Sequence, residues 1–211
     1  MSNERAVVAV IDDDESVRET LQRLLETVAL KVEAFGSADA FLKASQCHTP
    51  NCIVLDIRMP GTSGLDLQDE LASANNHTPI VFITGYGDIP MSVRAMKAGA
   101  VEFLVKPFRE QELLDAVRRG IKQDSTRRAE DQAMAELRMR LASLTPCEGE
   151  VMALLTAGWS NKQIAGQMGI SATTARVHRN QVLHKMCARS VADLVRMADK
   201  LDGQSPKQPP T

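Results

Sequence analysis

Four polar side chains follow short apolar runs of this sequence, and their chemical types together suit the transfer of a phosphoryl group. They are Asp12 after residues 6–11, Asp56 after residues 52–55, Thr84 after residues 80–83 and Lys106 after residues 103–105. Phosphoryl transfer needs a nucleophile, a cation that offsets charge on the oxygens, and fixed hydrogen-bond donors around them. An aspartate nucleophile gives an acyl phosphate, a labile linkage that suits a timed signal.

The apolar runs have to be strands if these side chains are to meet. With residues 31–35 as a further strand, five such runs alternate with stretches of helical period, as in residues 15–28. This alternation predicts right-handed crossovers and a parallel sheet that is covered by helices on both faces. Ligands bind such a sheet at the carboxyl ends of its strands. We therefore predict a doubly wound α/β domain with the four polar side chains at one edge.

A hard-cation site is expected at the same edge, because Asp12, Asp13 and Asp56 offer only carboxylate oxygens. Mg²⁺ suits this set because it keeps several waters and binds through one or two carboxylates plus phosphate. Lys106 is expected to pair with the phosphoryl group, and the Thr84 hydroxyl to hydrogen-bond to it.

The first part of the chain resembles the receiver domain of bacterial two-component response regulators. The resemblance covers residues 5–122 and rests on Asp12-Asp13, Asp56 with Met59-Pro60-Gly61, Thr84-Gly85 and Lys106-Pro107, in that order. It implies a five-stranded flavodoxin- or CheY-like sheet, with Asp56 as the phosphoacceptor. It also implies that Asp12, Asp13, Asp56 and the backbone carbonyl of Arg58 surround Mg²⁺. Lys106 would clamp the phosphate and precede a cis proline, and Thr84 and Phe103 would be the switch pair.

Arg58 and Tyr86 stand two residues beyond Asp56 and Thr84, where water must approach an acyl phosphate. We expect the bulky Tyr86 to lengthen the lifetime of the phosphorylated protein by obstructing that attack. The alternative is that Tyr86 is an ordinary loop aromatic.

The second part of the chain is more basic than the first. Residues 1–122 carry 13 Lys and Arg against 18 Asp and Glu, whereas residues 123–211 carry 12 against 9. Such a difference favours separate tasks and, for the second part, a polyanionic partner.

A helical linker is predicted for residues 123–143, which contain no Gly or Pro. Opposite charges at i,i+4, such as Asp124 and Arg128, indicate an exposed helix. An apolar stripe marks its end and the residue that follows, and two interpretations stay open: a short dimer seam, or a face that docks on the next domain. The stripe consists of Met134, Leu137, Leu141 and Leu144.

Three capping signals predict short helices after the linker. Thr145 to Glu148 and Ser160 to Gln163 are capping boxes, and Ser171 begins a further helix after the glycine turn at Gly169. Two helices joined by a tight glycine turn describe a helix-turn-helix. We therefore divide the chain into a phosphoacceptor domain at 1–122, the linker, a small all-α four-helix domain at 144–202 and a disordered tail at 203–211.

Residues 140–201 resemble the LuxR/FixJ-type helix-turn-helix, so the whole chain looks like a FixJ-type response regulator. The resemblance rests on LTPCEGEV at 144–151, GWSNKQIA at 158–165 and SATTARVHR at 171–179. It implies that Arg176, Val177 and Asn180 face bases in the major groove. The implied phosphate contacts come from Lys162, Thr173, Thr174, Arg179 and Lys185.

Predictions about packing and stability follow for four other residues of this domain. We interpret His178 as a packed or capping residue and Trp159, the only tryptophan, as an anchor in the core or between helices. Gly149 and Ala175 depart from the family pattern. Gly149 costs about 1 kcal/mol relative to Ala in a helix interior, and Ala175 fills less volume than the usual Val.

Composition excludes several classes of protein. The four cysteines, Cys47, Cys52, Cys147 and Cys187, show neither a CxxC pair nor zinc spacing, which favours reduced, structural thiols. The apolar run near the amino terminus is too short for a secretory core or a membrane span. We therefore expect a soluble cytoplasmic protein without a membrane partner.

The expected function is a phosphorylation-activated transcriptional regulator that is not an enzyme beyond its own phosphorylation from phosphohistidine and its slow autodephosphorylation. A sensor histidine kinase would phosphorylate Asp56, and the face around Met91, Val93 and residues 97–105 would then dimerise. The homodimer would bind double-stranded promoter DNA, with RNA polymerase as a further candidate partner. The sequence leaves open whether phosphorylation releases a masked DNA-binding domain or drives dimerisation.

Three other functions fit parts of the sequence. A phosphate sink or phosphatase would turn phosphate over quickly and show no specific DNA affinity. A phosphorylation-independent DNA binder with a vestigial receiver is disfavoured because none of the acids, the Thr or the Lys is missing. A haloacid-dehalogenase-type phosphatase carries a DxD arrangement after its first strand, whereas Asp56 follows the third.

Overall fold

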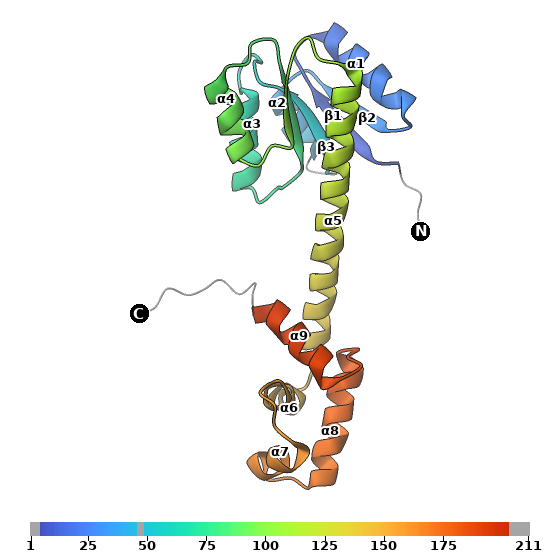
Figure 1. Cartoon of the computed structure of the whole chain (residues 1–211), viewed down its shortest axis with the longest axis vertical. Coiled ribbons are helices and arrows are strands. Elements are labelled where there is room, and N and C mark those ends of the chain that lie inside the picture. The colour runs from blue at the N-terminus through green and yellow to red at the C-terminus, as the bar shows by residue number, and fades with distance from the viewer. Residues whose placement is uncertain (1–4, 46–48, 203–211) are drawn as a thin grey trace. The chain divides into compact units, whose positions relative to one another are not determined.

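The computed structural model of this protein describes residues 5–45 and 49–202 (Figure 1). The chain forms two compact units, which divide between Arg128 and Ala129. Each unit has its own hydrophobic core. Cys47 and the tail expected at 203–211 lie outside the described residues.

The first unit is built on five parallel strands in the order β2-β1-β3-β4-β5, which confirms the predicted doubly wound sheet. Strands β3 and β4 are buried along their whole length, as the continuous apolar runs of a covered parallel sheet require. The strands are β1 (Val7–Ile11), β2 (Lys31–Phe35), β3 (Cys52–Asp56), β4 (Ile80–Thr84) and β5 (Glu102–Val105).

Helices cover both faces of this sheet because successive side chains of a strand point to opposite sides. Val8 and Val10 of β1 join one cluster with α1 and α5, while Ala9 and Ile11 join a second cluster with α2, α3 and α4. Burial of each large aliphatic side chain stabilises the unit by about 1.5–3 kcal/mol. The helices are α1 (Glu15–Thr27), α2 (Ala38–Ser45), α3 (Gly64–Ser73), α4 (Ile89–Lys97) and α5 (Glu110–Ala142).

Nearly all of the stretch expected as a separate linker belongs to α5, which is unbroken as far as Ala142. The predicted pair is present, since Arg128 Nε lies 2.6 Å from Asp124 Oδ2. The expectation that this part of the helix is exposed is nevertheless wrong at Asp124, whose side chain is fully buried. The i,i+4 spacing indicated the pair but carried no information about the residues around it.

The apolar stripe at the end of α5 packs within the chain. Leu137 is buried in the core of the second unit, and Met134 and Leu144 pack against that core. Leu141 is 38% exposed. Three of the four side chains of the stripe therefore pack within the chain, as the docking interpretation requires, and a dimer seam stays a prediction.

The second unit contains the four predicted helices, and its capping signals are used as expected. Thr145 and Ser160 each complete a capping box, and Ser171 caps the third helix. Gly169 ends the second helix in the left-handed conformation, with φ of 65°, which is the tight turn of a helix-turn-helix. The helices are α6 (Pro146–Thr156), α7 (Asn161–Met168), α8 (Ala172–Lys185) and α9 (Val191–Asp202).

Trp159 does not anchor the core, so that part of the prediction made for it is wrong, and an anchor between helices stays a prediction. Its side chain is 38% exposed and belongs to none of the buried clusters. Aliphatic residues such as Ile164 and Leu194 fill the centre instead, with the small Ala175 fully buried beside them. His178 is half-buried, with Nε2 lying 3.8 Å from Cys147 Sγ, so it is a packed residue as predicted.

Three cysteines lie in the described residues, and all three are free thiols. Cys52 is buried in β3, and burial raises the pKa of its thiol to about 12. Cys187 is exposed, so the expectation of a structural thiol is wrong there. Among the described residues, no helix combines the length and hydropathy needed to cross a bilayer.

We predict that Gly149→Ala stabilises the second unit. An added Cβ at Gly149 has no heavy atom within 4 Å, so the variant should gain about 1 kcal/mol from the lower entropy of Ala in a helix. Urea unfolding of the full chain, followed by Trp159 fluorescence, measures this. The control is Gly169→Ala, which should lose about 1 kcal/mol because an L residue is strained at its positive φ.

A second prediction concerns acid unfolding of the same unit. The hydrogen bond from Lys185 and the backbone N–H of Thr145 lower the pKa of Glu148 to about 2. A lowered pKa stabilises the fold above the unfolded value of about 4.3, and this contribution is lost as the pH falls from there towards 2. Glu148→Gln should flatten the pH dependence of unfolding in that range. The exposed Glu150→Gln on the same helix should leave it unchanged.

Candidate functional site

The carboxyl edge of the sheet brings the predicted acids together. β1 and β3 are neighbours, with Ile11 opposite Leu55, so Asp12 and Asp56 follow side by side. Asp12 is fully buried and Asp56 is nearly so. Two neighbouring buried carboxylates need a cation beside them, because an unpaired buried charge costs several kcal/mol.

Lys106 supplies that cation. Its Nζ lies 2.7 Å from Asp12 Oδ2 and 3.2 Å from Asp56 Oδ2, so one ammonium bridges both acids. The backbone N–H of Lys106 donates to the carbonyl of Thr84, which fixes the start of the loop after β5. The Lys106-Pro107 peptide bond is cis, as the family resemblance implied.

Burial and charge act against each other at this centre. Burial raises the pKa of Asp12, although the hydrogen bond from Lys106 opposes the shift. Burial alone would lower the pKa of Lys106. The hydrogen bond to Asp12 and the charges of Asp12 and Asp56 have the larger effect, and the pKa of Lys106 is therefore raised. The raised pKa favours the charged form of Lys106, which suits it to pair with anionic oxygens at this edge.

The predicted hard-cation ligands also meet here. Carboxylate oxygens of Asp12, Asp13 and Asp56 lie within 4.8 Å of one another, with Asp13 exposed at the rim. A set of oxygen donors only, partly open to water, has the chemistry that Mg²⁺ requires. The backbone N–H of Arg58 donates to Asp56 Oδ1 at 3.2 Å, and the expected metal contact of its carbonyl stays a prediction.

Thr84 is buried with its hydroxyl engaged in its own loop. Thr84 Oγ1 donates to the carbonyl of Tyr86 and accepts from the backbone N–H of Tyr86, both at 3.3 Å. The same loop lies against Phe103, because a Cβ at Gly87 would stand 2.9 Å from Phe103 Cε1. Phe103 itself is half-buried against the core. The predicted switch pair is thus connected through the β4–α4 loop.

Two side chains lie at the outer side of this centre. The guanidinium carbon of Arg58 is 5.2 Å from the centre of the Tyr86 ring, a cation–π contact. Tyr86 is 74% exposed. It is thus neither packed in the core nor without a partner, and the contact joins the loop after β3 to the loop after β4.

Sequence reasoning missed Arg18, which supports Asp12 from α1. Arg18 Nη1 donates to the backbone carbonyl of Asp12 at 2.7 Å. The guanidinium lies beside Gly36, where a Cβ would be 3.6 Å away. No sequence signal marks this contact, because the half-buried face of a helix usually carries apolar residues. Asp14 caps α1 through the backbone N–H of Ser16, which is consistent with a structural acid.

An apolar surface lies on α4 and β5 of the same unit. Ile89 is 78% exposed, and Val93, Met96 and Val105 are each exposed by more than two fifths. We call these four side chains the α4–β5 face. Met91, which was expected on it, instead packs against the core, because only part of a short helix can face outward.

The side chains expected to read bases lie on the exposed side of α8. Arg176, Val177 and Asn180 are all exposed, and Val177 is 49% exposed although it is apolar. The expected phosphate contacts are spread over α7 and α8. Lys162, Thr173 and Thr174 are exposed, whereas Arg179 is half-buried.

Lys185 has a partner within the chain. Its Nζ lies 2.6 Å from Oε2 of the buried Glu148, which in turn accepts from the backbone N–H of Thr145. A phosphate contact from Lys185 would compete with this ion pair, so we assign the residue to the capping network of α6. Sequence spacing did not reveal it, because the two residues are 37 positions apart.

Known families match both units. The response regulator receiver domain matches residues 8–118, and the luxR family of bacterial regulatory proteins matches residues 142–198. The first match spans Asp12, Asp56 and Lys106, which we call the carboxylate centre. The second match spans the helix-turn-helix.

Similar proteins match this chain over most of its length. The chain is 50% identical to nodulation protein W of Bradyrhizobium diazoefficiens over 93% of this chain and 87% of that protein. It is 44% identical to the transcriptional regulatory protein FixJ of Azorhizobium caulinodans over 90% of each chain. The structure of the response regulator StyR superposes with a TM-score of 0.84 at 46% identity, covering 93% of this chain and all of that one. This chain therefore belongs to the response regulators that join a receiver domain to a LuxR-type DNA-binding domain.

Proposed function

We propose that a sensor histidine kinase phosphorylates Asp56 of this transcriptional regulator, and that the phosphorylated receivers dimerise and thereby increase binding to promoter DNA. The observation that carries the proposal is the placement of Asp56 beside Lys106 and Asp12, on the same chain as an exposed recognition helix. A regulator of promoters would act in the cytoplasm, where bacterial DNA lies.

The transfer step follows from the arrangement of the three charged groups. A carboxylate oxygen of Asp56 attacks the phosphorus of the phosphohistidine, a P–O bond forms and the P–N bond to the imidazole breaks. Lys106 already points its ammonium at both acids, so it is placed to neutralise an oxygen of the incoming group. Mg²⁺ held by Asp12, Asp13 and Asp56 would offset the remaining negative charge.

The switch would start at Thr84. Its hydroxyl has to leave the backbone of Tyr86 in order to donate to a phosphoryl oxygen, which shifts the β4–α4 loop. Because this loop touches Phe103 at Gly87, Phe103 can turn inward only as the loop moves. Gly87 also lies beside Val105 of the α4–β5 face, so a shift of the loop would reach that face.

The α4–β5 face is the surface that we assign to the dimer. A contiguous exposed apolar surface on a water-exposed helix commonly marks a protein interaction site. A two-fold dimer of receivers would bring two copies of α8 to paired half-sites, as is usual for helix-turn-helix proteins. Arg176, Val177 and Asn180 would then read base edges, with Lys162, Thr173, Thr174 and Arg179 on phosphates.

An electrophoretic shift on pooled random duplexes tests the proposal. At fixed salt, Mg²⁺ with beryllofluoride should increase sequence-selective binding by the full chain about tenfold or more, the effect of linking two half-sites. Asp56→Ala should abolish the increase and keep the basal binding. Asp39→Ala, which changes an exposed acid on α2, away from the switch loop and the α4–β5 face, is the matched control and should respond like wild type.

Two results would contradict the proposal. Selective binding that is indifferent to beryllofluoride would separate the receiver from DNA binding. A complete absence of selective binding would favour an output based on phosphate turnover.

The lifetime of the phosphorylated state gives a further prediction. Because Tyr86 and Arg58 contact each other beside the centre, Tyr86→Ala should open a path for water and speed dephosphorylation several-fold. Tyr86→Phe keeps the ring and should retain the slow rate. Loss of labelled phosphate from the full chain measures both. An alanine variant that dephosphorylates no faster than wild type would leave Tyr86 as an ordinary loop residue.

A further inference from the structure

A second buried carboxylate lies outside the carboxylate centre. Asp124 of α5 is fully buried, and its two oxygens accept three hydrogen bonds. Asn51 Nδ2 donates at 2.8 Å, Arg127 Nη2 at 2.7 Å and Arg128 Nε at 2.6 Å. A buried charge needs such partners to persist, and none of these residues takes part in phosphoryl transfer.

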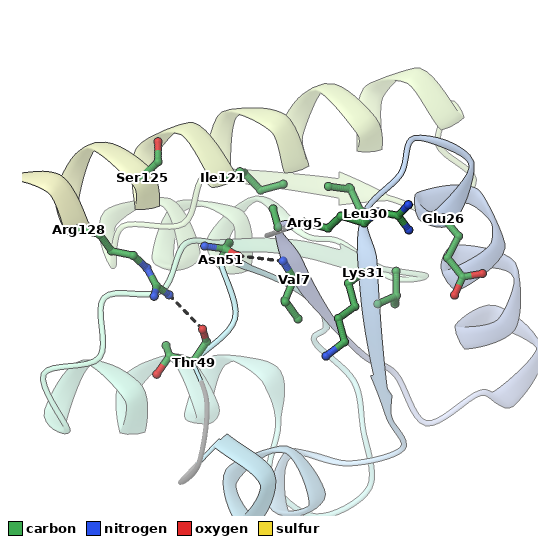
Figure 2. Close-up of a pocket in the computed structure, with 12 residues that line it drawn as sticks. Arg5, Val7, Glu26, Leu30, Lys31, Thr49, Asn51, Ile121, Ser125 and Arg128 are labelled. Atoms are coloured by element: carbon green, nitrogen blue, oxygen red, sulfur yellow. Dashed lines mark hydrogen bonds between the residues drawn. The ribbon is translucent and has the colours of Figure 1, made fainter. Parts of the chain in front are cut away.

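The network extends from α5 to the amino ends of two central strands. Asn51, which directly precedes β3, also accepts a hydrogen bond from the backbone N–H of Val7 at the start of β1. Arg128 Nη2 donates to the carbonyls of Thr49 and Pro50 at 3.0 and 3.1 Å. Figure 2 shows the bond from Arg128 to Thr49 and the bond between Asn51 and Val7 along one cavity wall. β1 and β3 are the strands whose opposite ends lead to Asp12 and Asp56.

Within the described part of α5, Asp124 is the last buried side chain that belongs to the first unit. The match to the receiver family ends at residue 118, before the α5 residues of the network. Within α5, the next buried side chain after Asp124 is Leu137 of the second unit. Residues 129–133 are all exposed. Most of the stability of a helix in a protein comes from packing of its buried face, so this exposed part of α5 depends on the packed turns on either side of it.

We propose that Asp124 is a positioning residue for the output of the receiver. Its hydrogen bonds make residues 124–128 a fixed part of the receiver, and the DNA response to phosphorylation depends on that fixation. Without the network, a longer part of α5 is unsupported and samples more conformations. Binding to paired half-sites must then order these conformations, which costs affinity in the dimeric state. The inference rests on the proposed function, in which phosphorylation of Asp56 increases DNA binding.

The test compares full-length variants by DNA binding at fixed salt, with and without Mg²⁺ and beryllofluoride. In Asp124→Ala, the gain in affinity on adding beryllofluoride should fall about tenfold, while basal binding stays within about twofold of wild type. Hydrogen exchange should show faster exchange of the amides of residues 124–128. Fluorine NMR of bound beryllofluoride should show that the carboxylate centre is still loaded.

Asp124→Ala changes a fully buried site and could disturb folding, so a second variant changes an exposed member of the network. Arg128 is 44% exposed, so Arg128→Gln removes the bonds to Thr49 and Pro50 without placing a new group in the core. It should reduce the gain in the same direction as Asp124→Ala. Glu130→Ala removes an exposed carboxylate from the same helix and is the matched control, with an unchanged gain.

The outcomes separate this inference from the proposed function. If wild type gains affinity and both network variants gain as much, the positioning role is overturned and the proposed function stands. An equal loss of basal and activated binding in Arg128→Gln would also overturn it, because the network would then serve only folding. If wild type itself shows no gain, the proposed function fails and the positioning role fails with it.

Discussion

One ammonium between two buried carboxylates is the interaction on which the rest of this receiver depends. Asp12 and Asp56 lie together because β1 and β3 are adjacent in the sheet, and Lys106 reaches both carboxylates from the loop after β5. Three features hold these groups in place: the strand order, the hydrogen bond from the backbone N–H of Lys106 to the carbonyl of Thr84, and the hydrogen bond from Arg18 to the carbonyl of Asp12. The arrangement keeps a cation at the place where phosphoryl oxygens would develop charge.

The same physical rule recurs at the other buried acids of the described residues. Asp124 is held by Arg127, Arg128 and Asn51, and Glu148 is held by Lys185 and the backbone of Thr145. Each of these networks joins segments that are far apart in sequence: α5 to the sheet, and α8 to the start of α6. Buried charges are costly when a partner is removed, so each network fixes one relative placement of its elements. Buried acids in this protein therefore fix the placement of helices and strands, in addition to forming the candidate site of phosphoryl transfer.

Local patterns predicted most of the elements and the carboxylate centre. Apolar runs located the strands within a residue or so, because a parallel strand that is covered on both faces must be apolar throughout. Capping boxes at Thr145 and Ser160 marked helix starts, because they satisfy backbone groups a few residues away. Asp12, Asp56 and Lys106 could be grouped because strand ends share one edge in this type of sheet. Trp159 was misjudged because aromatic character alone does not say which side of a turn faces the core.

The sequence by itself determined the α/β fold, the second helical domain and the residue types at the carboxylate centre, since these depend on periodicity, caps and motif order. Tertiary structure alone decided the partners of individual polar groups. The tertiary structure buries Asp124, pairs Lys185 with Glu148 and packs Leu137 into the core of the second unit. It also joined Arg58 to Tyr86 and brought Gly87 against Phe103. The reason is that burial and pairing depend on segments distant in the chain, which periodicity does not encode.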